Sequence, residues 1–178
     1  KGIVVCMKRK IVVFFMILIC FLLQCTVFQA LSLGGIVPNL LIMLTSSFGF
    51  MKGRKEGIFV GFISGMLIDV FYSSFYGGYA LIYMVIGYAN GYFHRIFYPE
   101  DVKLPIIFIT VSDFIYCIIT YVFLFLLRTR IHFFFYLKSV IFPELVYTVV
   151  ITVIFYRLIL LIHRKLEESE KRSASKFV

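Results

Sequence analysis

Four charged residues lie inside long apolar stretches of the sequence, and these are the side chains best placed to do chemistry: Asp69, Asp113, Glu144 and Arg157. Such stretches indicate membrane helices, where a charge at the centre costs roughly 2.5 to 3.5 kcal/mol unless it is paired or hydrated. A proton relay or an enzyme would need several acids at one depth, together with histidine, serine or cysteine. Only Asp69 and Asp113 are deep acids, so the charges favour structural pairing over catalysis.

Two of these charges are expected to pair with each other. If residues 104–127 and 139–162 form an antiparallel helical hairpin, Arg157 lies about one helical turn beyond the level of Asp113. One turn is about 5.4 Å, which the long guanidinium side chain can cover. We therefore predict an ion pair between Asp113 and Arg157.

Asp69 has no evident partner in the sequence. A buried carboxylate can hydrogen-bond to backbone or to nearby hydroxyls, such as those of Ser73 and Ser74. It can also contact a partner subunit or line a ligand cavity. The sequence leaves these roles open.

Residues 128–138 are basic at both ends and aromatic in the middle. They form either a short segment with its rings at the level of the lipid headgroups or an external docking surface for an acidic or apolar partner. The contact residues of such a surface would include Arg128, Arg130 and Tyr136. Glu144 follows closely, so we expect it to pair locally with a basic residue of this segment.

The cysteines and histidines show no metal or redox signature. The sequence has no CxxC pair, and the cysteines within apolar segments, Cys20, Cys25 and Cys117, are expected to be small apolar fillers. The three histidines are far apart and lack HExxH spacing. GxSxG, P-loop and GxGxxG motifs are also missing, so the sequence indicates neither an enzyme nor a cofactor or metal site.

The elements that must position these residues are apolar helices. The chain is 62% hydrophobic and 15% charged, which is too little polar surface for a soluble globule of 178 residues. Three segments are long enough to cross a bilayer core of about 30 Å: 11–31, 104–127 and 139–162. Three others are shorter or interrupted by small and polar residues: 36–51, 57–75 and 79–96. We predict an all-α integral membrane protein with six transmembrane helices, and a re-entrant hairpin over 36–75 is the alternative.

The distribution of basic residues predicts the orientation of this bundle. With six crossings and the N-terminus inside, fourteen of the eighteen Lys and Arg residues fall in cytoplasmic parts, and the three external ones all lie between 128 and 138. Since Lys and Arg accumulate on the cytoplasmic side, we expect both termini to be cytoplasmic. The net charge of +9 is therefore a topology signal. It does not indicate nucleic-acid binding, because the basic residues do not form one patch.

The chain divides into one membrane domain with short ends. Met7 and the basic residues that follow it are typical of a translation start, so residues 1–6 would be an N-terminal extension. Residues 7–163 are expected to form a single polytopic membrane domain. Residues 164–178 form a polar cytoplasmic tail that continues the last helix briefly and whose basic residues favour anionic membrane lipid.

Small residues recur at four-residue steps in two neighbouring segments: Gly57, Gly61 and Gly65 in the first, and Gly87 and Gly91 in the second. A four-residue step keeps these positions on one side of a helix, so that another helix can approach closely. The first row ends on Asp69, and Asn90 adds a group for an interhelical hydrogen bond. We predict close packing along both rows, either within the protein or against a neighbour.

The run from Gly61 to Asp69, followed by Gly78-Tyr-Ala-Leu81 and Gly87-Tyr88, resembles the central signature of the rod shape-determining protein MreD family. The opening of the second apolar segment, Pro38-Asn39-Leu40-Leu41, resembles the same family. Asn39 stands where an acidic residue is common in that family. The resemblance covers nearly all of residues 7–170.

The resemblance implies a non-enzymatic scaffold of the bacterial elongation (rod) complex, which supports lateral peptidoglycan synthesis and cell shape from the cytoplasmic membrane. The implied partners are a bitopic MreC-like protein, RodA-type and penicillin-binding synthase components, MreB filaments and membrane lipids.

The family is similar in fold to the substrate-binding S components of energy-coupling-factor vitamin transporters, so an S component is the main alternative. S components typically dock their coupling subunit through small residues of the first helix. This sequence has Phe14, Phe15 and Phe21 there, which favours the scaffold.

Overall fold

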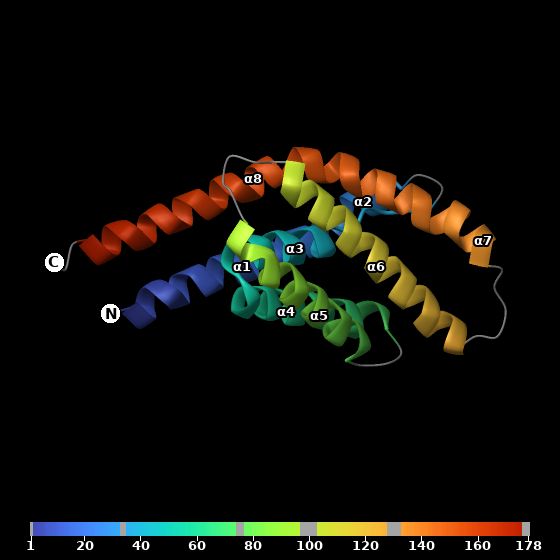
Figure 1. The fold of residues 1–178 in the computed structure, drawn as a ribbon, viewed down its shortest axis with the longest axis horizontal. Coiled ribbons are helices and arrows are strands. Elements are labelled where there is room, and N and C mark those ends of the chain that lie inside the picture. Colours follow the sequence, from blue (N-terminus) through green and yellow to red (C-terminus); the bar gives the residue numbers. More distant parts are fainter. Residues whose placement is uncertain (1, 33–34, 74–76, 97–102, 128–132, 176–178) are drawn as a thin grey trace.

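The structure is a computed structural model that describes residues 2–32, 35–73, 77–96, 103–127 and 133–175. Six long helices make up this part of the chain (Figure 1): α1 (Gly2–Cys25), α3 (Leu40–Lys52), α4 (Arg54–Tyr72), α5 (Gly78–Tyr92), α6 (Lys103–Leu127) and α8 (Phe142–Ser175). Shorter helical pieces extend them: α2 (Val27–Ala30), the 3-10 turn η1 (Phe93–Ile96), α7 (Phe133–Tyr136) and the π-helix η2 (Leu137–Ile141). Each long helix corresponds to one predicted apolar segment, which confirms the all-α class.

Within the described residues, three helices are long and apolar enough to cross a membrane: Arg9–Ala30, Lys103–Phe123 and Leu137–Glu168. Their outward faces carry large exposed apolar side chains, such as Phe15 in α1 and Ile107 in α6. Faces of this kind require an apolar surrounding. The transmembrane character of the chain is thus supported by these helices. The helices α3 and α5 have 13 and 15 residues, and at 1.5 Å per residue they reach only about 20 Å and about 22 Å.

The short helix α3 lies at the centre of the bundle. It packs against α1, α4, α5, α6 and α8, and every residue from Leu40 to Met51 is buried. A helix that is apolar on all sides is stable only when other helices surround it. Its first turn is fixed by Asn39, whose side-chain oxygen accepts a hydrogen bond from the N–H of Ile42 at 3.2 Å.

A single residue, Gly53, connects α3 to α4. Its φ of +92° is in the region that favours glycine, because a side chain there would clash with the backbone. The two helices remain in contact beyond this turn, since Gly57 faces Gly49 across it. A row of small residues therefore begins directly after this single-residue turn.

The last helix differs from the prediction at both ends. It was expected to begin near residue 139, but its helical course starts at Phe133 and passes through the π-helix η2 just before Pro143. Pro143 has no N–H to donate to an earlier carbonyl, and a wider turn at this point accommodates the missing bond. At its other end α8 continues to Ser175, well beyond the brief extension expected for the polar tail.

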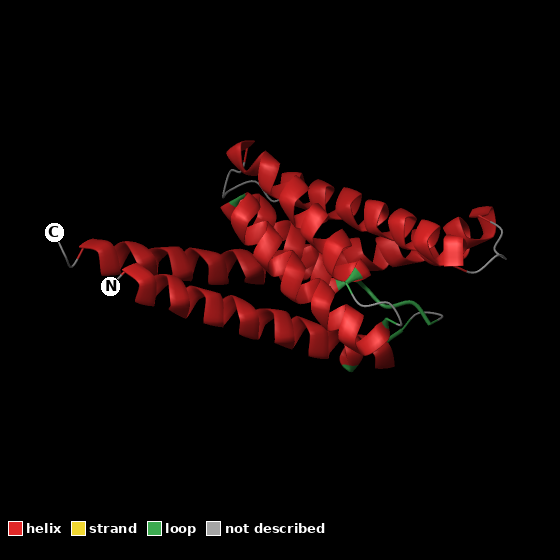
Figure 2. Cartoon of the chain, turned by 90° about the horizontal axis from the view of Figure 1, so that it is seen from below, coloured by secondary structure: helices red, strands yellow, loops and turns green. Residues whose placement is uncertain are grey.

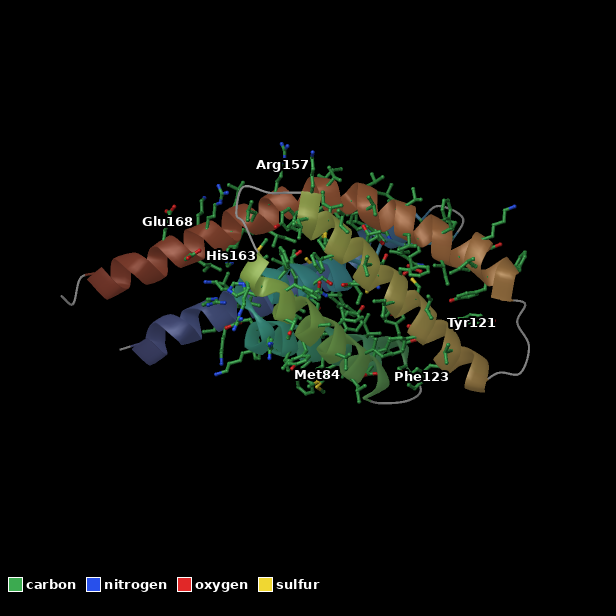
Figure 3. All side chains as sticks on the ribbon, in the orientation of Figure 1. Met84, Tyr121, Phe123, Arg157, His163 and Glu168 are labelled. Atoms are coloured by element: carbon green, nitrogen blue, oxygen red, sulfur yellow. The ribbon has the colours of Figure 1, made fainter. Side chains whose placement is uncertain are left out.

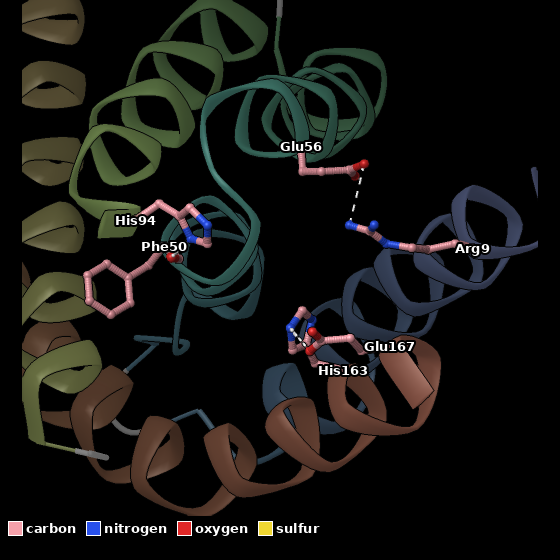
Figure 4. A network of polar contacts seen from close by, with 6 residues as sticks. All are labelled: Arg9, Phe50, Glu56, His94, His163 and Glu167. Carbon is pink, nitrogen blue, oxygen red and sulfur yellow. Dashed lines mark hydrogen bonds and ion pairs between the residues drawn. The ribbon is translucent and has the colours of Figure 1, made fainter. Parts of the chain in front are cut away.

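Both termini lie at the same end of the molecule, where α1 and α8 project beyond the other helices (Figures 1 and 2). Residues from separate basic clusters meet near this end. Arg9 of α1 forms an ion pair with Glu56 of α4 at 3.4 Å, and His94 and His163 lie nearby (Figure 4). The side chain of Lys10 lies over the ring of Phe59 at 5.3 Å. Basic segments that are far apart in the sequence thus share one end of the bundle.

Candidate functional site

The first candidate site is the contact between α4 and α5, along which the glycine rows face each other. A Cβ added to Gly57 would collide with the backbone of Gly87, and one added to Gly61 would collide with the carbonyl group of Tyr83. A Cβ at Gly65 would collide with the backbone of Ala80. The rows therefore pack inside the protein, where they allow two backbones to approach more closely than side chains would permit.

The second glycine row is enclosed as tightly as the first. A Cβ at Gly91 would lie 2.5 Å from backbone atoms of Arg54, and one at Gly49 of α3 would lie 2.7 Å from the carbonyl oxygen of Gly87. Three helices thus meet at glycine positions. The unit formed by α3, α4 and α5 is the most closely packed part of the bundle.

Asp69 lies in the last turn of α4, at the end of this contact, and is 2% exposed. Its two carboxylate oxygens accept hydrogen bonds from the backbone N–H groups of Tyr79, at 3.1 Å, and Ala80, at 2.8 Å. These are free N–H groups of the first turn of α5, where a negative charge is stabilised by the helix dipole. Of the roles that the sequence left open, the hydrogen bonds show a backbone-capping one for Asp69.

Asn90 connects the glycine-packed unit to α6. Its side-chain amide donates to the hydroxyl of Ser112 at 2.7 Å and to the carbonyl of Ile86 at 2.9 Å. A longer contact of 3.4 Å reaches the hydroxyl of Ser46 in α3. One buried amide therefore joins three helices, which fits the interhelical role considered for it.

A second candidate site joins α6 to α8 and consists of Asp113, Cys117 and Glu144, which we call the acid–thiol cluster. Asp113 and Cys117 lie one turn apart on α6, and Glu144 lies in the first turn of α8. One carboxylate oxygen of each acid and the sulfur of Cys117 lie within 4.8 Å of one another. Asp113 is fully buried, and neither of its carboxylate oxygens makes a hydrogen bond of ordinary geometry within the described residues.

The predicted ion pair between Asp113 and Arg157 is wrong. Asp113 points into the bundle, whereas Arg157 is exposed on the outer side of α8 and points away from the other helices (Figure 3). Its neighbour Tyr156 takes the inward position and is 1% exposed. The depth of two residues can be estimated from a hairpin register, but successive residues of a helix point about 100° apart, so depth does not determine facing.

Glu144 is also oriented differently from the expectation. It lies beside Asp113 and Cys117, while Lys138, one of the basic residues expected to reach it, is exposed. Arg128 and Arg130 fall outside the described residues. Tyr136 is partly buried and packs on Tyr121 with 4.9 Å between the ring centroids.

Polar residues of α8, of α5 and of the turn before α3 border the acid–thiol cluster. The hydroxyl of Thr148 in α8 accepts a hydrogen bond from the backbone N–H of Asn39 at 3.1 Å. The hydroxyl of Tyr83 in α5 donates to the side-chain oxygen of Asn39 at 3.1 Å. The side chain of Thr148 also lies close to Asp113. The start of α3 is thus connected to α5 and to the surroundings of the cluster.

Sequence reasoning missed the acid–thiol cluster because its members come from two helices and include a cysteine expected to be a filler. The available signal was the spacing of Asp113 and Cys117, which at i and i+4 share one face of a helix. It also missed the polar contacts of the histidines. His163 is 4% exposed and lies 3.8 Å from Glu167, and His94 is hydrogen-bonded to the carbonyl of Phe50 at 2.9 Å (Figure 4).

Among known protein families, the chain matches the model described as rod shape-determining protein MreD, over residues 7–166. Comparisons with curated proteins and with solved structures gave no match. The family match includes both glycine rows, Asp69 and the acid–thiol cluster. Since it covers most of the 178 residues, the chain belongs to the rod shape-determining protein MreD family and is a membrane protein of cell-shape determination.

Proposed function

We propose that the chain is a non-enzymatic membrane scaffold of the bacterial elongation complex, which supports lateral peptidoglycan synthesis by binding an MreC-like bitopic partner. The observation that carries this proposal is the family match over residues 7–166. The packing of the helices supports this proposal. The glycine contacts between α4 and α5 and the hydrogen bonds of Asp69 and Asn90 all hold helices of the chain together. Further partners would be RodA-type and penicillin-binding synthase components, MreB filaments on the cytoplasmic side, and membrane lipids.

We further propose that the six long helices each cross the bacterial cytoplasmic membrane, with both termini in the cytoplasm. The meeting of Arg9 with Glu56, close to the Lys52 to Lys55 turn, supports this arrangement, because it places separate basic segments at one end of the bundle. The short helices α3 and α5 would cross the membrane inside the bundle, where neighbouring helices surround them. Topology reporters fused after residues 53, 75, 100 and 130 test this: alternation between inside and outside is expected, and a shared side for 53 and 75 would favour a re-entrant hairpin.

The scaffold is favoured over an S component by the position of the small residues. In the S-component hypothesis a row of small residues must be available on the surface for the coupling subunit. Here Gly57, Gly61 and Gly65 are enclosed between α4 and α5, and α1 exposes bulky side chains such as Phe15 and Leu22. Within the described residues, the glycine rows therefore pack against other helices of the same chain.

Affinity purification of the tagged full chain in mild detergent tests the scaffold directly. We expect an MreC-like partner in the eluate and rounded cells after depletion of the chain. Stoichiometric recovery of a vitamin and an ATPase module, without an MreC-like protein, would instead establish the S component.

A crosslinking experiment then locates the partner face. A photoreactive residue is placed at one exposed position of four outward-facing helices, α1, α4, α6 and α8: Phe15, Phe62, Val111 and Val150. Crosslinks to the MreC-like partner from one or two neighbouring helices are expected for a defined docking face. Equal, weak crosslinks from all four positions would contradict specific binding.

A further inference from the structure

We propose that the acid–thiol cluster of Asp113, Cys117 and Glu144 is a binding site for a thiophilic divalent cation, with Zn²⁺ as the ion that fits best. The three side chains offer two carboxylate oxygens and one sulfur within 4.8 Å of one another. Ligand atoms bound to one zinc ion lie at about 2.0 to 2.3 Å from the metal. Small rotations of the side chains can therefore bring all three onto one ion.

The helices bring these ligands together in a manner that suits a fixed site. Asp113 and Cys117 are four residues apart on α6, so their side chains emerge on the same face one turn apart. Glu144 approaches from the first turn of α8, which packs against α6. A cation held by all three would connect the two helices at this point.

The charge balance of the cluster points to a cation. Asp113 is 0% exposed, and neither of its oxygens makes a hydrogen bond of ordinary geometry to the described side chains, although the side chain of Thr148 lies close to it. A buried carboxylate without donors is strongly unfavourable, and a second carboxylate beside it makes full ionisation worse. The nearest expected counter-charge, Arg157, faces outward. A divalent cation would compensate the two acids where no basic side chain of the described chain does.

The ligand types select the kind of cation. Magnesium and calcium prefer six or more oxygen ligands, including several waters or carbonyls, which this narrow cluster does not supply. A cysteine ligand favours zinc and related transition metals, and zinc is commonly held by three protein ligands with one position left open. Thr148, which lies close to Asp113 and accepts from the N–H of Asn39, is positioned to orient the carboxylate.

Glu144 indicates how an ion would reach the site. Asp113 and Cys117 are buried, but Glu144 is only partly buried and lies near the end of α8 opposite to the termini. An ion would therefore enter from that end of the bundle. In the proposed orientation this is the external side of the membrane.

The test uses the full-length chain in lipid nanodiscs, purified with an affinity tag that contains no histidine and then freed of metal. Cobalt(II) is added as a spectroscopic substitute for zinc. We expect about one cobalt per chain and a thiolate-to-cobalt charge-transfer band that added Zn²⁺ removes. The Cys117→Ser variant should lose the band, whereas Cys20→Ser, which changes a buried cysteine of α1, should keep it.

The carboxylate variants complete the design. Asp113→Asn and Glu144→Gln should each weaken zinc binding by more than roughly tenfold, the size of effect that changes outside the ligand shell already produce. A thiol-labelling measurement covers variants that fold poorly: in the wild-type chain, Zn²⁺ should slow alkylation of Cys117 and leave Cys25 unaffected. A folded wild-type chain without the band, a band that survives Cys117→Ser, or labelling of Cys117 that ignores zinc would each overturn the proposal. None of these outcomes depends on the scaffold function.

Discussion

The carboxylate of Asp69 accepts a hydrogen bond from the backbone N–H of Ala80 at 2.8 Å, and this contact fixes the start of α5 against the end of α4. The acid thus completes the same interhelical contact that the glycine row begins. Replacing Asp69 by Ala should lower the free energy of unfolding by about 2 kcal/mol, because a charge-assisted cap at a helix N-terminus is lost. Asp69→Asn, which keeps one acceptor oxygen, should lose about half as much.

Thermal unfolding in detergent, followed by circular dichroism, measures this difference. Recovery of an MreC-like partner should fall only in proportion to the folded fraction. If Asp69→Ala unfolds at the wild-type temperature but no longer recovers the partner, the residue contacts the partner directly and the capping role is secondary.

The close packing of the glycine rows predicts that the effect of a glycine substitution on stability depends strongly on its position. Gly61→Ala should destabilise the protein by about 1 to 3 kcal/mol, because its methyl group would meet the backbone of Tyr83. Gly61→Leu should prevent accumulation in the membrane. The matched control is Gly78→Ala, since a Cβ there has no atom within 4 Å and the backbone is helical. Immunoblotting of membrane fractions and thermal unfolding provide the readout, and equal tolerance of Gly61→Ala and Gly78→Ala would refute the packing role.

Arg157 should be replaceable. Its side chain is exposed and points outward from α8 (Figure 3), so Arg157→Gln should change the free energy of unfolding by less than about 0.5 kcal/mol. Exchanging the charges at positions 113 and 157 should not restore a protein weakened by a change at Asp113. Accumulation of the single and exchanged variants in membranes decides this, and a rescue by the exchange would restore the ion-pair hypothesis.

Arg9 and Glu56 connect the N-terminal half of α1 to the first turn of α4, and their side chains are 14% and 21% exposed. A double-mutant cycle with Arg9→Gln and Glu56→Gln should give a coupling energy of about 0.5 to 1 kcal/mol. The coupling should decrease as salt is added, because the pair is partly accessible to solvent. Lys55→Gln removes an adjacent, exposed charge and serves as the control. Independent effects of the two changes would show that their contact is incidental.

The helices themselves were largely predictable from sequence. Each of the six long helices overlaps a segment predicted from apolar length, because only a helix satisfies its backbone groups in an apolar surrounding. The boundaries of α3, α4 and α5 differ from the prediction by a few residues. The start of the last helix was missed, since the effect of Pro143 on the turn before it is not visible as hydropathy.

Contacts between helices were predictable only where a residue type has essentially one structural use. Glycine at every fourth position is useful mainly for close backbone approach, so the rows were recognisable before their partners were known. The facing of Asp113 was not recognisable in this way, because hydropathy carries no information on which side of α6 meets α8. The association of Cys117 with two acids depends on the same facing and was therefore missed.

The enclosure of α3 has a consequence for how the protein is made. This helix leaves the ribosome second among the long helices, yet α5, α6 and α8, which cover it, are synthesised later. Before these later helices are inserted, the 13 residues of α3 lack most of their packing partners, and the polar Thr45, Ser46 and Ser47 are not covered by other helices. The bundle therefore closes around its centre only when the last helix is in place, and a chain truncated before α8 should be recognised by membrane quality-control proteases as incomplete.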